Sequence, residues 1–281
     1  MENKFIFKSK YQIIHKNTNS RQRLSGIVFL RSCCSLGIII YHYFCHSNGK
    51  FKLLYKTANS DWGFMFVTSF FCISGAVHYY NYRTVNSLKI FYFKRWKSIF
   101  PSYYLCFIYF YSKNVFQYKK LFFRGHWSRL ILTIFGLDGY LRRIFKTYNL
   151  IGEWFVGSII IIYFLYPLLS WLININILII NYIICVYYFF NYYTNNLKNL
   201  GKRNIFNCIN SFYFGMITIK FHKLFFKNKK FFIISFIIFV LFYFIRISLI
   251  VPLFQIQGFS LYIILIYIGE YIMMYKIKYI F

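Results

Sequence analysis

The chain has 281 residues, of which 59% are hydrophobic and 26% aromatic, and its formal net charge is +29. A soluble domain of this length cannot bury so much apolar surface, so lipid must be the solvent for much of the chain. The basic residues lie mostly between apolar runs rather than on one interleaved basic face, which argues against a nucleic-acid partner.

The first 23 residues are polar and basic, and the apolar run that follows continues to about Cys45 with no small-residue cleavage site. We therefore interpret residues 1–23 as a cytoplasmic tail rather than a cleavable export signal. Residues 24–281 contain no repeat of fixed period and no linker rich in Pro, Gly or Ser, which predicts a single transmembrane domain. The seven cysteines form no C-x-x-C pair, so no zinc or redox motif is expected.

Apolar segments long enough to cross a bilayer, about 20 residues each, recur along the chain. They can be placed at 24–45, 62–82, 100–116, 151–173, 177–194, 205–219, 231–254 and 256–275. The predicted fold is therefore an all-α polytopic membrane bundle of about eight transmembrane helices. Residues 127–141 are short and contain Arg129 and Asp138, so we predict an interfacial or re-entrant helix there.

The positions of the basic residues predict the orientation, because short loops rich in Lys and Arg stay cytoplasmic. Basic residues gather in 1–23, 83–99 and 220–230, which places the N-terminus in the cytoplasm of a multi-pass plasma-membrane protein. The segment 113–149 is assigned to the outer side although it also carries Lys and Arg.

The first predicted span contains two ionisable residues, Arg31 and His42. They are eleven residues apart, which brings them to nearly the same helix face, about 16 Å apart along the axis. An ionisable residue inside a span is a candidate functional residue. The alternative is that Arg31 snorkels to the interface and His42 lies inert among the outer headgroups. His42 and His46 could together ligate a metal, but no third ligand is evident nearby, and no metal site is predicted.

Four motifs follow one another along the first 170 residues: "FLRSCCSLGIIIYHYF", "GFMFVTSFFCISG", "YFKRWKSIFPSYY" and "GEWFVGSIIIIYFLYPLL". In this order they resemble the acyltransferase type 3 family of integral membrane acyltransferases, and "SFYFGMITIK" at 211–220 looks like a later span of that family. The residues that match its motifs are Arg31, His42, Phe70, Phe71, Ser74, Gly75, Arg95, Ile99, Pro101, Tyr103, Trp154, Phe155, Tyr163 and Pro167.

The resemblance implies transfer of an acyl group, most often acetyl, from cytoplasmic acetyl-CoA to a hydroxyl of a cell-surface or capsular polysaccharide or its precursor. No tightly bound cofactor is expected. Arg31 and Arg95 would bind the donor phosphates, since guanidinium groups pair bidentately with phosphate. His42 would act as general base or carry the acyl group transiently. Glu153 would bind the acceptor or orient His42. The alternative is that its negative charge is only stabilised by the helix dipole at the N-terminal end of its span.

The chain departs from the family pattern at several positions. Ser98 replaces the second arginine of the basic motif, which leaves Lys97 as the nearest donor-binding substitute, and Thr68 stands where many members carry an acid. The family usually has about ten spans rather than eight. A transporter or carrier for polysaccharide or lipid, and an inactive truncated homologue, are the alternative functions.

The remaining motif residues are expected to support the site. Ser74 and Gly75 are interpreted as residues that allow close helix packing, rather than as a nucleophile and its neighbour. Pro101 is expected in the first turn of the third span, where its missing N–H costs nothing. Tyr103 follows it in the same motif.

Overall fold

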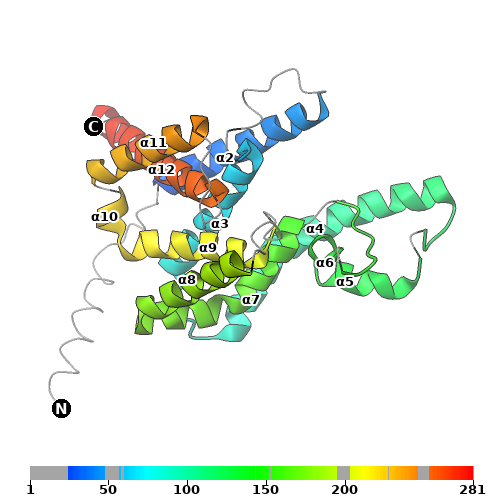
Figure 1. Cartoon of the computed structure of the whole chain (residues 1–281). Helices are drawn as coiled ribbons and strands as arrows, with labels where there is room; N and C mark the ends of the chain where they lie inside the picture. Colours follow the sequence, from blue (N-terminus) through cyan, green and yellow to red (C-terminus); the bar gives the residue numbers. More distant parts are fainter. Residues whose placement is uncertain are drawn as a thin grey trace, which may run out of the picture.

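The computed structural model describes residues 25–47, 57, 60–123, 125–142, 144–151, 154–194, 203–226, 228–245 and 253–280. Every regular element in these ranges is a helix (Figure 1). In chain order they are α2 (Ser25–His46), α3 (Trp62–Asn81), α4 (Leu88–Tyr118), η2 (Trp127–Arg129), α5 (Leu130–Ile134), α6 (Asp138–Leu141), α7 (Trp154–Ile175), α8 (Ile177–Tyr193), α9 (Ile205–Lys220), α10 (His222–Phe226), α11 (Lys229–Phe244) and α12 (Leu253–Ile280). The all-α prediction is confirmed for this part of the chain.

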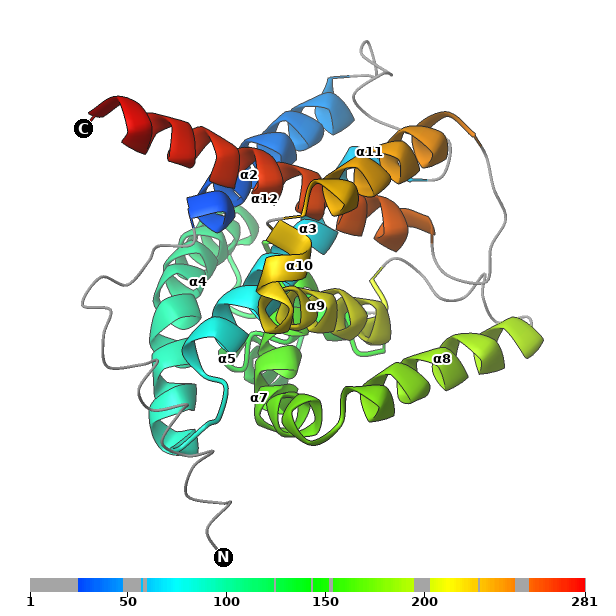
Figure 2. The same ribbon diagram turned by 90° about the vertical axis from the view of Figure 1, so that its left-hand side faces the viewer.

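Helix α3 lies at the centre of the bundle. It packs against α9, α2 and α12, and α12 also packs against α2 and α11. Most of one side of α3 is buried in these contacts, including Met65, Phe71 and Ala76, and α9 contributes Phe212 and Met216 to the same core. Helices α4 and α8 lie on opposite sides of this core (Figure 2).

Four helices in the described ranges are long and apolar enough to cross a membrane: Gly26–His46, Trp62–Asn81, Trp154–Ile175 and Leu253–Ile272. Each coincides with a predicted span. The prediction of about eight spans is not confirmed, because α8, α9 and α11 have only 17, 16 and 16 residues. At 1.5 Å per residue such helices are about 24–26 Å long, shorter than a typical hydrocarbon core.

The outward face of the bundle is apolar, as a lipid environment requires. On α8 the side chains of Leu178, Tyr182 and Phe189 are 66%, 71% and 65% exposed. An apolar face of this extent would aggregate a soluble monomer, whereas hydrocarbon solvates it at no cost. The helical bundle is therefore that of a membrane protein.

Helix α4 corrects the expected position of Pro101. The helix begins at Leu88, where the side chain of Ser87 accepts a hydrogen bond from the N–H of Ile90, and it continues through Pro101 to Tyr118. Pro101 therefore lies in the helix interior, where it cannot donate to the carbonyl of Lys97. Interior prolines are tolerated in membrane helices because neighbouring groups compensate for the lost bond. The apolar segment that was expected to be a separate span is the second half of this longer helix.

Residues 127–141 form three short helices, η2, α5 and α6, rather than the single helix that was expected. The side chain of Asp138 is fully buried and accepts a hydrogen bond from the hydroxyl of Thr133. This bond links α5 to α6 and fixes the turn between them.

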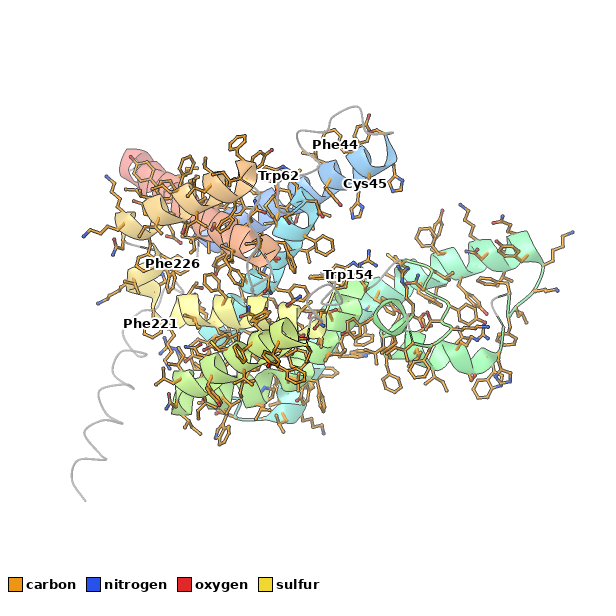
Figure 3. The ribbon with its side chains drawn as sticks, in the orientation of Figure 1. Phe44, Cys45, Trp62, Trp154, Phe221 and Phe226 are labelled. Atoms are coloured by element: carbon orange, nitrogen blue, oxygen red, sulfur yellow. The ribbon has the colours of Figure 1, made fainter. Side chains whose placement is uncertain are left out.

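Aromatic contacts join the outer helices to the central one. Trp62, at the first turn of α3, packs against Phe239 and Tyr243 of α11 with ring centroids 6.0 and 6.1 Å away. Trp154, at the start of α7, packs against Phe64 of α3 at 6.1 Å. Figure 3 places these two tryptophans at the ends of their helices. Such ring pairs stabilise a packed interface beyond the area they bury.

Candidate functional site

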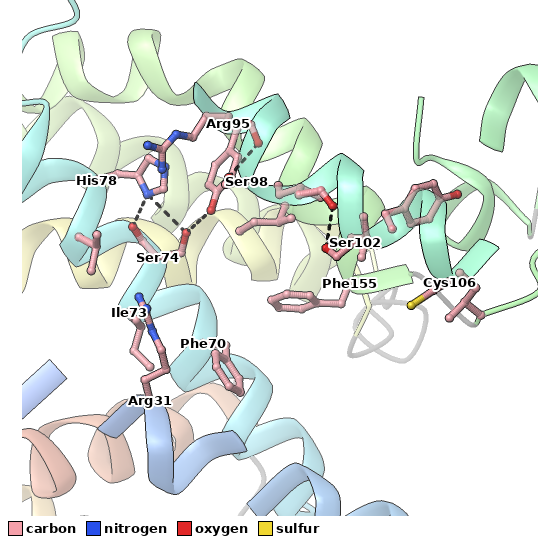
Figure 4. Close-up of a pocket in the computed structure, with 17 residues that line it drawn as sticks. Arg31, Phe70, Ile73, Ser74, His78, Arg95, Ser98, Ser102, Cys106 and Phe155 are labelled. Atoms are coloured by element: carbon pink, nitrogen blue, oxygen red, sulfur yellow. Dashed lines mark hydrogen bonds between the residues drawn. The ribbon is translucent and has the colours of Figure 1, made fainter. Parts of the chain in front are cut away.

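A cavity of about 760 Å³ lies among α2, α3, α4 and α7, within the usual size range of small-molecule sites. Its polar lining comes from several helices and consists of Arg31, Ser74, His78, Arg95, Ser98, Ser102, Tyr103 and Tyr163. Apolar side chains such as Phe70, Ile99 and Phe155 complete the wall (Figure 4). The cavity therefore combines a few convergent polar groups with an apolar wall, which is typical of a binding site.

Helix α7 fixes the turn between α3 and α4, and this turn sets the position of the cavity's polar side chains. The hydroxyl of Tyr166 donates to the carbonyl of His78 over 3.0 Å and also contacts the carbonyl of Tyr82. Ser170 and Asn174 both donate to the carbonyl of Arg83, at 2.6 and 2.7 Å. The carbonyl of His78 also accepts from the N–H of Tyr82, and the carbonyls of Tyr82 and Arg83 belong to the turn that follows α3, so these bonds hold that turn against α7.

The imidazole of His78 is buried at the polar end of the cavity and bonds through both ring nitrogens. Nδ1 lies 2.7 Å from the carbonyl oxygen of Ser74, and Nε2 lies 2.9 Å from Nη1 of Arg95. A carbonyl only accepts and a guanidinium only donates. The geometry therefore assigns the neutral tautomer with its proton on Nδ1, in which Nε2 accepts from Arg95.

The guanidinium of Arg95 is held by rings as well as by His78. Its central carbon lies 5.4 Å from the ring centroid of Tyr82, 5.7 Å from that of Phe91 and 6.0 Å from that of Tyr163. Nη2 lies 3.4 Å from the hydroxyl of Tyr82, and Nε is buried with no hydrogen-bond partner among the described residues. Arg95 as a whole is half-buried, but a buried N–H without a partner is costly, so an anion that accepts from Nε would be stabilised here.

Ser74 is not arranged as a nucleophile. Its hydroxyl lies 2.9 Å from the hydroxyl of Tyr163 and 3.5 Å from Nδ1 of His78. In the assigned tautomer Nδ1 carries the proton and donates it to the Ser74 carbonyl, so the imidazole cannot accept a proton from the Ser74 hydroxyl at this position. An activated serine needs such a base. The Ser74 hydroxyl is better explained as a hydrogen-bond partner that orients the side chain of Tyr163.

Two arginines from different helices reach the same cavity. Arg31 enters from α2 and Arg95 from α4, and Figure 4 shows the Arg31 side chain directed toward Ser74 and His78. Among the described residues that line the cavity, none is acidic. The local potential is therefore positive, and the cavity is suited to an anion that guanidinium groups recognise, such as a phosphate.

The other predicted residues lie in different places. His42 is exposed on α2, eleven residues beyond Arg31 and about 16 Å along the axis, and it does not line the cavity. Lys97 is exposed on α4 and also lies outside the lining. Glu153 lies outside the described residues.

The other supporting residues, Tyr103, Pro101 and Gly75, lie in three different environments. Tyr103 is buried and lines the cavity. Pro101 is exposed on α4. Gly75 is buried where α3 meets α9, and a Cβ atom at this position would overlap the carbonyl of Phe212. The small residue is what allows the two backbones to approach this closely.

Sequence reasoning missed His78 as part of the site. One signal was available, because an ionisable residue inside a predicted span is a functional candidate. His78 is also one helical turn from Ser74, which is a motif residue. Its partner Arg95, however, lies on the next helix, and no spacing rule within one helix predicts that contact.

No family model, curated protein or solved structure matches this chain. The resemblance to the acyltransferase type 3 family therefore stays a prediction.

Proposed function

We propose that the chain is a membrane O-acyltransferase that moves an acyl group, with acetyl the expected one, from cytoplasmic acetyl-CoA to a hydroxyl of a cell-surface or capsular polysaccharide or its precursor. One observation supports this most strongly. Arg31 and Arg95, which are 64 residues apart in sequence, line one cavity whose described lining contains no acid. Coenzyme A carries phosphate and diphosphate groups, which are the anions that guanidinium pairs recognise bidentately.

The position of His42 fits a role at the other end of the donor. With the N-terminus in the cytoplasm, Arg31 lies in the inner half of α2 and His42 in the outer half. An extended pantetheine arm is comparable in length to the separation of about 16 Å between them. The exposed imidazole is accessible to an acceptor hydroxyl, for which it would serve as general base or as transient acyl carrier.

The test is transfer of labelled acetyl from acetyl-CoA to glycan in membranes that contain the chain at equal protein level. We expect Arg31→Ala and Arg95→Ala to raise the KM for acetyl-CoA, because each removes a phosphate ligand. We expect His42→Ala to lower kcat by at least 100-fold, the lower range of general-base contributions. His46→Ala is the matched control, since His46 is also exposed and lies one turn further along α2.

Two outcomes would overturn the proposal. The first is no transfer by the intact chain across a panel of acceptor glycans. The second is full activity of His42→Ala, which would show that His42 is neither the general base nor the transient acyl carrier. Uptake of a lipid-linked or anionic saccharide into proteoliposomes, without acyl transfer, would establish the carrier function instead.

A further inference from the structure

We infer that His78 is a positioning residue for the donor site: its Nε2 atom holds the Arg95 guanidinium in the orientation that presents its remaining N–H groups to a donor phosphate. The inference rests on the proposed function only for the identity of the anion, which is a phosphate of the acyl donor. Its geometric basis is the chain of contacts from the Ser74 carbonyl through His78 to Arg95, at 2.7 and 2.9 Å.

The imidazole is itself held rigidly, which a positioning role requires. Its ring lies 4.4 Å from that of Tyr163, 5.4 Å from that of Tyr166 and 5.8 Å from that of Phe212. The His78 residue is 2% exposed, and its Nδ1–H donates to the Ser74 carbonyl. With rotation blocked, Nε2 stays directed at Nη1 of Arg95.

The contact also determines which part of Arg95 is left for an anion. A guanidinium has five N–H groups in a fixed planar fork. Nη1 is occupied by His78, Nη2 lies at a long distance of 3.4 Å from the hydroxyl of Tyr82, and Nε has no hydrogen-bond partner in the described part of the chain. These two neighbouring nitrogens form one edge of the fork, and a bidentate phosphate would bind to such an edge.

Two substitutions separate positioning from packing. His78→Phe keeps a ring among Tyr163, Tyr166 and Phe212 but removes the acceptor for Arg95. His78→Gln provides a carbonyl oxygen that can accept from Nη1 and an amide that can donate to the Ser74 carbonyl. Hydrogen bonds to charged groups are strong enough that losing this one should weaken anion binding by about tenfold or more.

The experiment measures equilibrium binding of coenzyme A to the purified full chain in neutral detergent, together with the KM and kcat of acetyl transfer. We expect His78→Phe to weaken coenzyme A binding and raise KM about tenfold with kcat within about twofold, and His78→Gln to bind within about threefold of wild type. In the Arg95→Met background, His78→Phe should have no further effect, because two residues that act through one contact are not additive.

The possible results distinguish this inference from the proposed function. Wild-type protein that binds coenzyme A but transfers nothing overturns the proposed function and leaves the binding test of His78 intact. Equal losses in His78→Gln and His78→Phe, or additive losses in the Arg95→Met background, overturn the positioning role. Absence of coenzyme A binding by the wild type overturns the anion role of Arg95 and the inference with it.

Discussion

Gly75 of α3 and Gly215 of α9 lie at the same helix crossing and make it possible. A Cβ atom on Gly75 would overlap the carbonyl oxygen of Phe212, and one on Gly215 would overlap the carbonyl oxygen of Cys72. Both obstacles are backbone atoms, which cannot move away without displacing a helix. This crossing anchors the helix that also carries Ser74 and His78, so the packing of α3 on α9 sets the position of the cavity.

Gly75→Ala and Gly215→Ala should each destabilise the bundle by about 1–3 kcal/mol, the usual cost of forcing an extra carbon into a packed interior. The measurement is the free energy of unfolding, or the melting midpoint, of the purified protein in detergent.

Gly37→Ala is the matched control for this crossing. Its Cβ would meet the ring tip of Phe66, which is only partly buried and can turn aside. We expect a smaller loss of stability there. If Gly37→Ala lost as much stability as Gly75→Ala and Gly215→Ala, the close approach of α3 and α9 would not explain the effect of the two crossing glycines.

A buried polar network ties α8 and α9 to α12. The hydroxyl of Tyr188 donates to Oε1 of Gln255 over 2.6 Å and accepts from Nδ2 of Asn210 over 3.1 Å. Nε2 of Gln255 donates to the carbonyl of Asn207 over 2.6 Å. The side chain of Gln255 is fully buried, so each unpaired group would face an apolar interior.

Tyr188→Phe and Gln255→Leu should therefore each lower the stability, and the double variant should lose less than the sum of the two. Interhelical hydrogen bonds in membranes average about 0.6 kcal/mol and reach about 1.7 kcal/mol in such cycles. Tyr182→Phe, on the 71% exposed Tyr182 of the same helix, is the control and should be neutral. Strictly additive losses would mean that the two side chains are not coupled through this bond.

The sequence was sufficient to predict those helices that are long, continuous apolar segments. The spans expected at 62–82 and 151–173 became α3 and α7, because about 20 apolar residues can satisfy their backbone in lipid only as a helix. Pro101 shows where the local rule failed. Proline is common in the first turn of a helix, which is why a helix start was expected at Pro101. Helix α4 instead passes through Pro101, because the more polar segment before it is also helical.

The cavity shows a different limit of sequence reasoning. Arg31 and Arg95 were chosen as an anion site from motifs, and the structure brings both to one cavity. His78 could not be assigned from its own helix, because its role depends on Nη1 of Arg95 and on the ring of Tyr163, which lie on other helices. Periodicity identifies the residues that share a face of one helix, whereas the contact between helices follows from how their surfaces pack.

The small side chains of α4 give the cavity its width, and this can be tested with one substitution. Ser98, Ser102 and Cys106 are spaced four residues apart, so they lie along one face of α4, and all three line the cavity. The hydroxyl of Ser102 donates to the carbonyl of Ile99 on its own helix, at 3.1 Å. Figure 4 shows Ser102 between Ser98 and Cys106 on the cavity wall. A large ring at this position would occupy space that a ligand needs.

Ser102→Phe should therefore weaken coenzyme A binding by at least tenfold while leaving the melting midpoint within a few degrees of wild type, because an exposed serine in a helix tolerates substitution. Ser112→Phe makes the same change ten residues further along α4, outside the cavity lining, and should bind coenzyme A as the wild type does. Equal binding by both variants would place the ligand elsewhere. Equal loss in both would point to a general effect of a ring on α4, since Ser102 lines the cavity and Ser112 does not.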